Sequence, residues 1–142
     1  MKPDPSLHSA IDLHPLTVFP DTTVSDAIAR LLETDASCVL VIKSPNSPKL
    51  LGWLNDRDLL RSIASGKNDT DLTIQAVMKV PSSVLEASSE QNVSLLLDRF
   101  RKTELSHLPN VDAQGNLIGL VTQKSLLQAI DPQTVQGETI DR

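Results

Sequence analysis

The chain writes one pattern twice, and this internal duplication restricts its possible folds more than any other feature. "LLGWLNDRDLLRSIA", beginning at Leu50, corresponds to "LIGLVTQKSLLQAI", beginning at Leu117, at an offset of 67. Upstream, "AIDLHPLTV" from Ala10 aligns with "AVMKVPSSV" from Ala76 at an offset of 66. "VSDAIARLLETDAS" and "VSLLLDRFRKTELS" align at an offset of 69. A duplication over almost the whole chain predicts two copies of one supersecondary unit.

Each copy predicts the same order of elements, βαββα. A short extended segment, "PLTV" or "SSVL", leads into a helix with apolar residues at helical spacing, and Asp21 and Thr22 form the start signal in the first copy. Two apolar runs around a turn rich in Pro, Gly and Asn then predict a β-hairpin. "DRDLLRSIA" and "QKSLLQAI" predict closing helices. We expect an α/β (α+β) fold with repeat 1 and its N-terminal segment in residues 1–66, repeat 2 in residues 67–131, and a polar tail in residues 132–142.

Composition excludes several classes of function. The 142 residues carry a net charge of −5 with dispersed Lys and Arg, which disfavours binding to a phosphate backbone. With one Trp, two Phe and no Tyr, the aromatic platforms of single-strand binders are hard to assemble. Cys38 is the single cysteine, which is typical of a reducing compartment. The N-terminus lacks a signal-peptide pattern, and the longest apolar run, "CVLVI", is too short to cross a bilayer. We expect a cytoplasmic protein that binds neither nucleic acid nor membrane.

The pieces in this order resemble a tandem pair of CBS domains, known as a Bateman module. The resemblance rests on "TIQAVMKVP" before the second copy, "LSHLPNVDAQGNLIGLVT" in its hairpin and "LLGWLNDRDLL" in the first copy. The chain is similar to the N-terminal CBS pairs of bacterial, especially cyanobacterial, signalling proteins. The resemblance implies two repeats related by a pseudo-twofold axis, a homodimer, and an adenine nucleotide (AMP, ADP or ATP) or S-adenosylmethionine bound between the repeats. It implies no enzymatic activity and no required cofactor.

The resemblance also places a nucleotide site. In this family the last residue of Ser/Thr-x-x-Asp binds the ribose diol, and the first copy keeps this carboxylate as Asp58 in Asn55-Asp56-Arg57-Asp58. A carboxylate suits the role because it accepts two O–H hydrogen bonds and is favoured at a helix N-terminus. The predicted site consists of Asn55, Arg57, Asp58, Ser82, Ser83, Val84, His107 and Pro109.

Duller interpretations of these residues stay open. Asp58 could serve only as a helix N-terminal residue, Arg57 could be an ordinary surface residue, and His107 could pack rather than contact phosphate. Asp56 and Asp58 could suggest a metal-binding pair, but residues two apart on a helix point to different faces. We therefore expect no metal site.

The second copy has lost the carboxylate, since its motif reads Thr122-Gln123-Lys124-Ser125. The resemblance implies a second, weaker or empty cleft formed by Thr122 and Ser125 with Thr17 and Ser37.

Three functions can be weighed. The first is a regulatory module that senses an adenosine ligand and signals to an attached or partner effector, such as a histidine kinase, PAS or GGDEF domain. In that case we expect the chain to be the sensory fragment of a longer protein, with a stand-alone module as the alternative. The second is a ligand-free dimerisation or docking module, which the altered motifs keep open. The third, a small hydrolase, is disfavoured because the chain has no nucleophile signature, Walker loop or zinc-ligand spacing.

Overall fold

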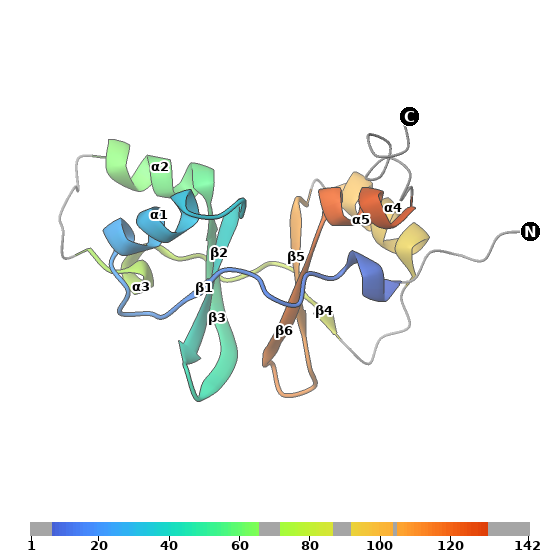
Figure 1. Cartoon of the computed structure of the whole chain (residues 1–142), viewed down its shortest axis with the longest axis horizontal. Coiled ribbons are helices and arrows are strands. Elements are labelled where there is room, and N and C mark those ends of the chain that lie inside the picture. The colour runs from blue at the N-terminus through green and yellow to red at the C-terminus, as the bar shows by residue number, and fades with distance from the viewer. Residues whose placement is uncertain (1–6, 66–71, 87–91, 104, 131–142) are drawn as a thin grey trace, which may run out of the picture. The chain divides into compact units, whose positions relative to one another are not determined.

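The polypeptide forms two units, each built around its own three-stranded sheet (Figure 1). A computed structural model of the chain describes residues 7–65, 72–86, 92–103 and 105–130. We name the units after their helices α1 (Val24–Leu32) and α2 (Asp56–Ala64), and α4 (Val93–Thr103) and α5 (Gln123–Ile130). The α1–α2 unit comprises Pro15–Ser82 and Ala113–Leu117; the α4–α5 unit comprises Met1–His14, Ser83–Asp112 and Ile118–Arg142.

The α1–α2 unit has the predicted βαββα order. Its sheet has the strand order β1-β2-β3, with β1 parallel to β2 and β2 antiparallel to β3. The helix α1 begins after Thr23, whose hydroxyl accepts a hydrogen bond from the Asp26 N–H, so the start signal lies one residue beyond the predicted Asp21 and Thr22. The remaining elements are β1 (Thr17–Val18), β2 (Cys38–Ser44), β3 (Ser47–Asn55) and a short helix α3 (Ile74–Val77).

The α4–α5 unit repeats this order, with the strand order β4-β5-β6 and β4 parallel to β5. The predicted βαββα pattern is therefore confirmed in both copies. A short helical turn that the sequence patterns did not predict lies before the first strand of each copy: η1 lies before β1, and α3 lies before β4. The elements are η1 (Leu7–Ala10), β4 (Leu85–Glu86), α4, β5 (His107–Val111), β6 (Leu117–Thr122) and α5.

The segment that leads into the first strand of each repeat packs in the unit that contains the sheet and helices of the other repeat. Residues 7–14 lead into β1 of the first repeat but belong to the α4–α5 unit, where Asp12 pairs with Leu120 of β6. Lys79 leads into β4 of the second repeat but belongs to the α1–α2 unit, where it pairs with Trp53 of β3. Both contacts are antiparallel bridges with two backbone hydrogen bonds of 2.8–3.0 Å.

These bridges correct the alignment of the leading segments. The two bridges are equivalent when Lys79 is matched with Asp12 and Leu120 with Trp53, and both matches have an offset of 67. The offset of 66 inferred from matching alanines and prolines is therefore wrong by one. Backbone pairing against a strand fixes the register of a short segment, whereas two small residues can match by chance.

Each unit has a separate apolar core. In the α1–α2 unit, Val24 and Ala27 of α1 are buried against the β-branched residues Val39 and Val41 of β2, and Leu59 of α2 joins them. In the α4–α5 unit the buried core residues are Ala10, Leu85, Val93, Leu96, Phe100, Leu108, Val121 and Leu126. The two leading segments contribute to these cores through Ala10 and Ile74, both fully buried. Packing the leading segments is thus part of folding each unit.

Glycine is required where each leading segment crosses a strand. A Cβ at Gly52 would lie 2.6 Å from the Met78 Sδ and 2.9 Å from the Lys79 carbonyl oxygen. A Cβ at Gly119 would meet the Ile11 side chain and, at 3.0 Å, the Asp12 carbonyl oxygen. The two glycines, one in each copy of the repeat, therefore make room for equivalent backbone contacts.

Several predictions concern residues that the structure does not describe. The polar tail at 132–142 and residues 66–71 of the linker between the repeats lie outside the described residues. The two units are defined by which residues pack together, and each contains segments from both repeats. They therefore do not test the predicted sequence limits at 66 and 131, which stay predictions. Among the described residues, no helix has both the length and the apolar character needed to cross a membrane.

We predict that Gly52→Ala and Gly119→Ala each destabilise the protein, by about 1–3 kcal/mol, because the added methyl group overpacks against backbone. Urea unfolding of the purified chain measures this. Gly115→Asn is the matched control: Gly115 has φ +84°, which asparagine tolerates, and a Cβ there meets nothing within 4 Å. An equal loss of stability in all three variants would contradict the assigned role of the two crossings.

Candidate functional site

The Asn55–Asp58 stretch forms a reciprocal cap at the start of α2. The Asp58 N–H donates to the Asn55 Oδ1 at 2.8 Å, and the Asn55 N–H donates to the Asp58 Oδ2 at 3.1 Å. Two backbone donors that the helix leaves unsatisfied thereby gain partners. The negative charge of Asp58 also lies in the first turn, where the helix dipole favours it.

The second copy forms the same cap without a carboxylate. The Ser125 N–H donates to the Thr122 Oγ1 at 3.0 Å, and the Thr122 N–H donates to the Ser125 Oγ at 2.9 Å. The hydroxyl of Ser125 thus replaces the Asp58 carboxylate as the returning acceptor. The cap therefore accounts for a polar residue at the fourth motif position, but not for an aspartate there.

Asp58 is also the centre of a charged cluster. The Lys79 Nζ lies 2.9 Å from the Asp58 Oδ2, and the Arg61 Nη1 lies 3.9 Å from the Oδ1. The Asp58 side chain is 11% exposed, compared with 48% for Lys79. Burial raises the pKa of the Asp58 carboxyl, but the hydrogen bonds from Lys79 and from the Asn55 backbone, with the charges of Lys79 and Arg61, bring the net pKa below its usual range. Asp58 is consequently an anion at neutral pH.

Lys79 reaches Asp58 because its backbone is attached to the neighbouring strand. The Lys79 N–H and carbonyl pair with the Trp53 carbonyl and N–H at 3.0 and 2.9 Å. The Lys79 Nζ also lies 4.8 Å from the centroid of the Trp53 ring, within the range of a cation–π interaction. The ammonium is thus held between a carboxylate and an aromatic ring, both from the α1–α2 unit.

Sequence patterns missed this role of Lys79. No local spacing connects it to Asp58, which lies in the preceding repeat. The correct register of the leading segments could have pointed to it, since Lys79 follows Met78, whose side chain crosses Gly52.

The other predicted residues of the α1–α2 unit are Arg57, Ser82, Thr17 and Ser37. Arg57 and Ser82 are exposed. The Thr17 carbonyl accepts a hydrogen bond from the Arg30 Nη1 at 3.2 Å, and the Ser37 carbonyl accepts one from the Asp56 N–H at 3.1 Å. Ser37, predicted for the second cleft, therefore contacts the beginning of α2, next to the cap of the first motif.

The α4–α5 unit holds Ser83, Val84, His107 and Pro109. The Val84 carbonyl accepts a 3.5 Å hydrogen bond from the Arg99 Nη2, and the His107 Nδ1 lies 2.7 Å from the Ser106 Oγ. Pro109 is buried in β5. The structure brings together Asn55 with Asp58 in one unit and Thr122 with Ser125 in the other, and the predicted combinations of residues from both units stay predictions.

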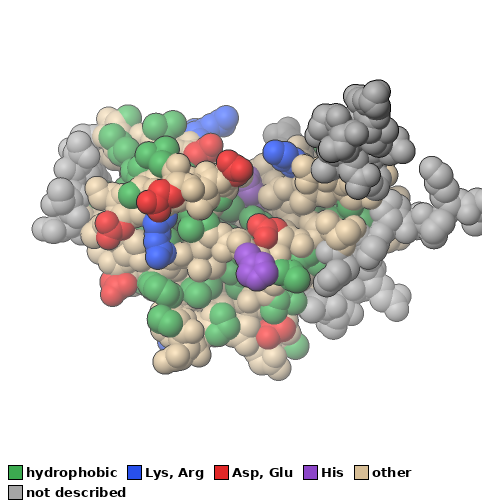
Figure 2. All heavy atoms as spheres, in the orientation of Figure 1, with side chains coloured by type: hydrophobic (Ala, Val, Ile, Leu, Met, Phe, Trp, Pro, Cys, Tyr) green, Lys and Arg blue, Asp and Glu red, His purple; other side chains and the backbone are tan. Residues whose placement is uncertain are grey.

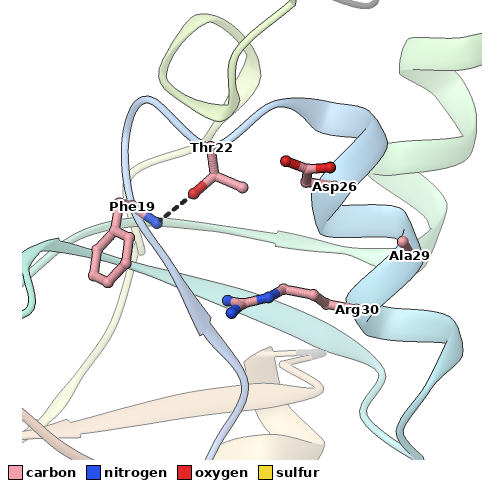
Figure 3. Close-up of a pocket in the computed structure, with 5 residues that line it drawn as sticks. All are labelled: Phe19, Thr22, Asp26, Ala29 and Arg30. Atoms are coloured by element: carbon pink, nitrogen blue, oxygen red, sulfur yellow. Dashed lines mark hydrogen bonds between the residues drawn. The ribbon is translucent and has the colours of Figure 1, made fainter.

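A separate pocket of about 310 Å³ lies beside α1 (Figure 3). Phe19 and Thr22 line it from the segment between β1 and α1, and Asp26, Ala29 and Arg30 line it from the helix. Arg30 extends from α1 toward β1 in this view, and the Thr22 hydroxyl accepts a hydrogen bond from the Phe19 N–H at 3.0 Å. The volume is at the lower limit for small-molecule sites, and no lining residue belongs to the Asp58 cluster.

On the face shown in Figure 2, Lys and Arg side chains lie singly among Asp and Glu side chains. Among the described residues, no three His, Cys, Asp or Glu side chains are grouped so that they could hold a metal ion. Asp58 combines a helix cap with two basic partners, and we take it as the candidate functional site.

Comparison with known proteins supplies the family. Residues 9–65 and 76–132 each match the family model of the CBS domain. The protein MK0525 of Methanopyrus kandleri is 28% identical over 123 residues, covering 84% of this chain and 59% of that protein. An inosine-5′-monophosphate dehydrogenase of Thermoplasma acidophilum is 25% identical over 111 residues, covering 78% of this chain and 21% of the enzyme.

A solved structure confirms the fold. The CBS domain pair of protein MJ0100, in complex with 5′-methylthioadenosine and S-adenosylmethionine, superposes with a TM-score of 0.70 at 18% identity, covering 85% of this chain and 95% of that one. At this identity the likeness concerns the fold alone. The chain spans little more than half of the length of MK0525 and about a fifth of the dehydrogenase.

We predict that the Asp58 ion pair makes stability depend on acid pH. Because its folded pKa is depressed below the ordinary 3.8, the stabilisation is complete above that value and is lost as the pH falls through the folded pKa. Asp58→Asn should cost roughly 1 kcal/mol at pH 7, and the difference from wild type should shrink below about pH 4. Unfolding free energies from pH 7 to 2 measure this.

Asp56→Asn is the matched control, since Asp56 is an exposed aspartate in the first turn of the same helix. A difference between wild type and Asp58→Asn that stays constant with pH would contradict the ion-pair assignment.

Proposed function

The chain belongs to the CBS domain family, and from this we propose that it is a regulatory module whose Asp58 binds the ribose of an adenosine-containing ligand. The ligand would be an adenine nucleotide (AMP, ADP or ATP) or S-adenosylmethionine. Its occupancy would be passed to an effector, attached or separate, of the histidine kinase, PAS or GGDEF type. The role is regulation rather than catalysis.

The observation that carries the proposal is the carboxylate in one cap and the hydroxyl in the other. Ser125 completes the cap of α5, so folding does not require an aspartate at the fourth position. Asp58 nevertheless stands there in the first copy, ionised at neutral pH. A carboxylate has about four acceptor sites, and the described contacts at its Oδ1 consist of Arg61 at 3.9 Å. That oxygen is suited to accept the O–H donors of a ribose diol.

The comparisons support the class of ligand. The MJ0100 pair, which shares this fold, is in complex with 5′-methylthioadenosine and S-adenosylmethionine, two compounds with the same adenosine core. The common element is a ribose with a free diol, which a carboxylate acceptor suits. Asp58 would therefore recognise the ribose that these ligands share.

We propose that the remaining residues of the first site also contact this ligand. They are Asn55, Arg57, Ser82, Ser83, Val84, His107 and Pro109. We also propose a cytoplasmic location and a homodimer.

A second candidate function, ligand-free docking or dimerisation, is favoured by exposed apolar residues at repeated positions. Leu60 of α2 is 66% exposed and Leu127 of α5 is 59% exposed, and Ile63 and Ile130 repeat this one turn later. Apolar groups left in water on a helix face suit a second copy of the chain. Such an interface could exist with or without a bound ligand, so dimer formation does not separate the two functions. A ligand-binding experiment does separate them.

We predict that an adenosine ligand raises the melting temperature of the wild-type chain by several degrees when present at 100 times its dissociation constant. This concentration corresponds to about 2.7 kcal/mol of stabilisation. The measurement is a thermal-shift panel with AMP, ADP, ATP and S-adenosylmethionine. Asp58→Ser should abolish the shift while leaving the protein folded, because Ser125 shows that serine completes this cap.

Asp56→Ser is the matched control, since it removes a neighbouring carboxylate from the same turn, and it should keep the shift. A folded wild-type dimer without a shift in any of these ligands would favour docking. A shift that survives Asp58→Ser would refute the ribose assignment.

A further inference from the structure

The ammonium of Lys79 occupies the position beside the proposed ribose acceptor. Its Nζ lies 2.9 Å from the Asp58 Oδ2 and 4.8 Å from the Trp53 ring centroid. Backbone pairing with Trp53 and the close approach of Met78 to Gly52 fix where the side chain starts. A ligand that binds Asp58 therefore binds next to a positive charge whose location is set by the fold.

The fold itself does not require this charge. The corresponding position in the α4–α5 unit is Asp12, which makes the same two backbone hydrogen bonds, to Leu120. Ser125 there occupies the position of Asp58. A leading segment can thus be held on its strand with an anionic residue in place of Lys79, so the lysine is open to another role.

Charge balance indicates what that role is. In the free protein Asp58 neutralises the ammonium. A ribose diol that donates to Asp58 weakens the hold of the carboxylate on Lys79, and a half-exposed ammonium beside an aromatic ring then gains most from a new anionic partner. An ammonium has three donors, so it can bind such an anion while staying near the carboxylate.

We propose that Lys79 is a specificity-determining residue that selects adenosine ligands with a negatively charged 5′ group. A 5′-phosphate provides the anion that Lys79 needs. The neutral thioether of 5′-methylthioadenosine provides none, and the sulfonium of S-adenosylmethionine brings a like charge toward the ammonium. This inference rests on the proposed function and narrows its ligand class to nucleotides.

The test is isothermal titration of the full chain with AMP, 5′-methylthioadenosine and S-adenosylmethionine. Wild type should bind AMP at least about tenfold more tightly than either of the others, the size expected for one hydrogen bond to a charged group. Lys79→Met, similar in length but neutral, should remove that preference, and Lys79→Arg should retain it. Lys43→Met, at an exposed lysine of β2, is the matched control and should behave as wild type.

The outcomes distinguish this inference from the function on which it rests. If 5′-methylthioadenosine binds as tightly as AMP and binding requires Asp58, the proposed function holds and the role of Lys79 is overturned. A preference for AMP that survives Lys79→Met also overturns it. If none of the three compounds binds wild type, and ADP and ATP titrated in the same way do not bind either, both the function and the inference fail.

Discussion

The close approach of a leading segment to a glycine on the neighbouring strand is the contact on which the rest of each unit depends. At Gly52 and Gly119 the missing side chain lets backbone carbonyl oxygens come within a distance that a Cβ would prevent. Two backbone hydrogen bonds then attach the segment to the strand. In the α1–α2 unit this contact also determines where the Lys79 side chain begins, and so places an ammonium beside Asp58. A backbone constraint thereby becomes an electrostatic feature of the site.

The reciprocal cap explains how the two copies diverged without losing their fold. A helix start needs an acceptor for its unsatisfied N–H groups, and both carboxylate and hydroxyl oxygens satisfy that need. Asn55 with Asp58 and Thr122 with Ser125 give nearly equal hydrogen-bond lengths. The fourth motif position can therefore change its charge at little cost to the helix. In the proposed function, the carboxylate of the first copy would serve as the ligand acceptor.

The charges around Asp58 act together. Lys79 and Arg61 keep the carboxylate ionised, because they offset the cost of its burial. The same carboxylate lies 2.9 Å from the ammonium of Lys79, so in the proposed function a ligand that binds one of these groups would alter the interactions of the other. A ligand that changes this balance needs to contribute only about 1–3 kcal/mol of coupling to act as a regulatory signal. That range is within reach of one charge-assisted hydrogen bond.

The duplication, the βαββα order and the hairpins followed from the sequence alone, because they depend on periodicity and turn residues that recur in each copy. The Asn55–Asp58 motif was also visible there, since a helix cap is local. The tertiary structure decided which segments pack together: the exchange of leading segments and the pairing of Lys79 with Trp53 join residues far apart in the chain. Aligning identical residues placed the leading segments one residue out of register, and the backbone hydrogen bonds gave the correct register. Sequence patterns did not identify Lys79 because its role depends on the register at which the leading segment crosses Gly52, and that register was misplaced by one residue.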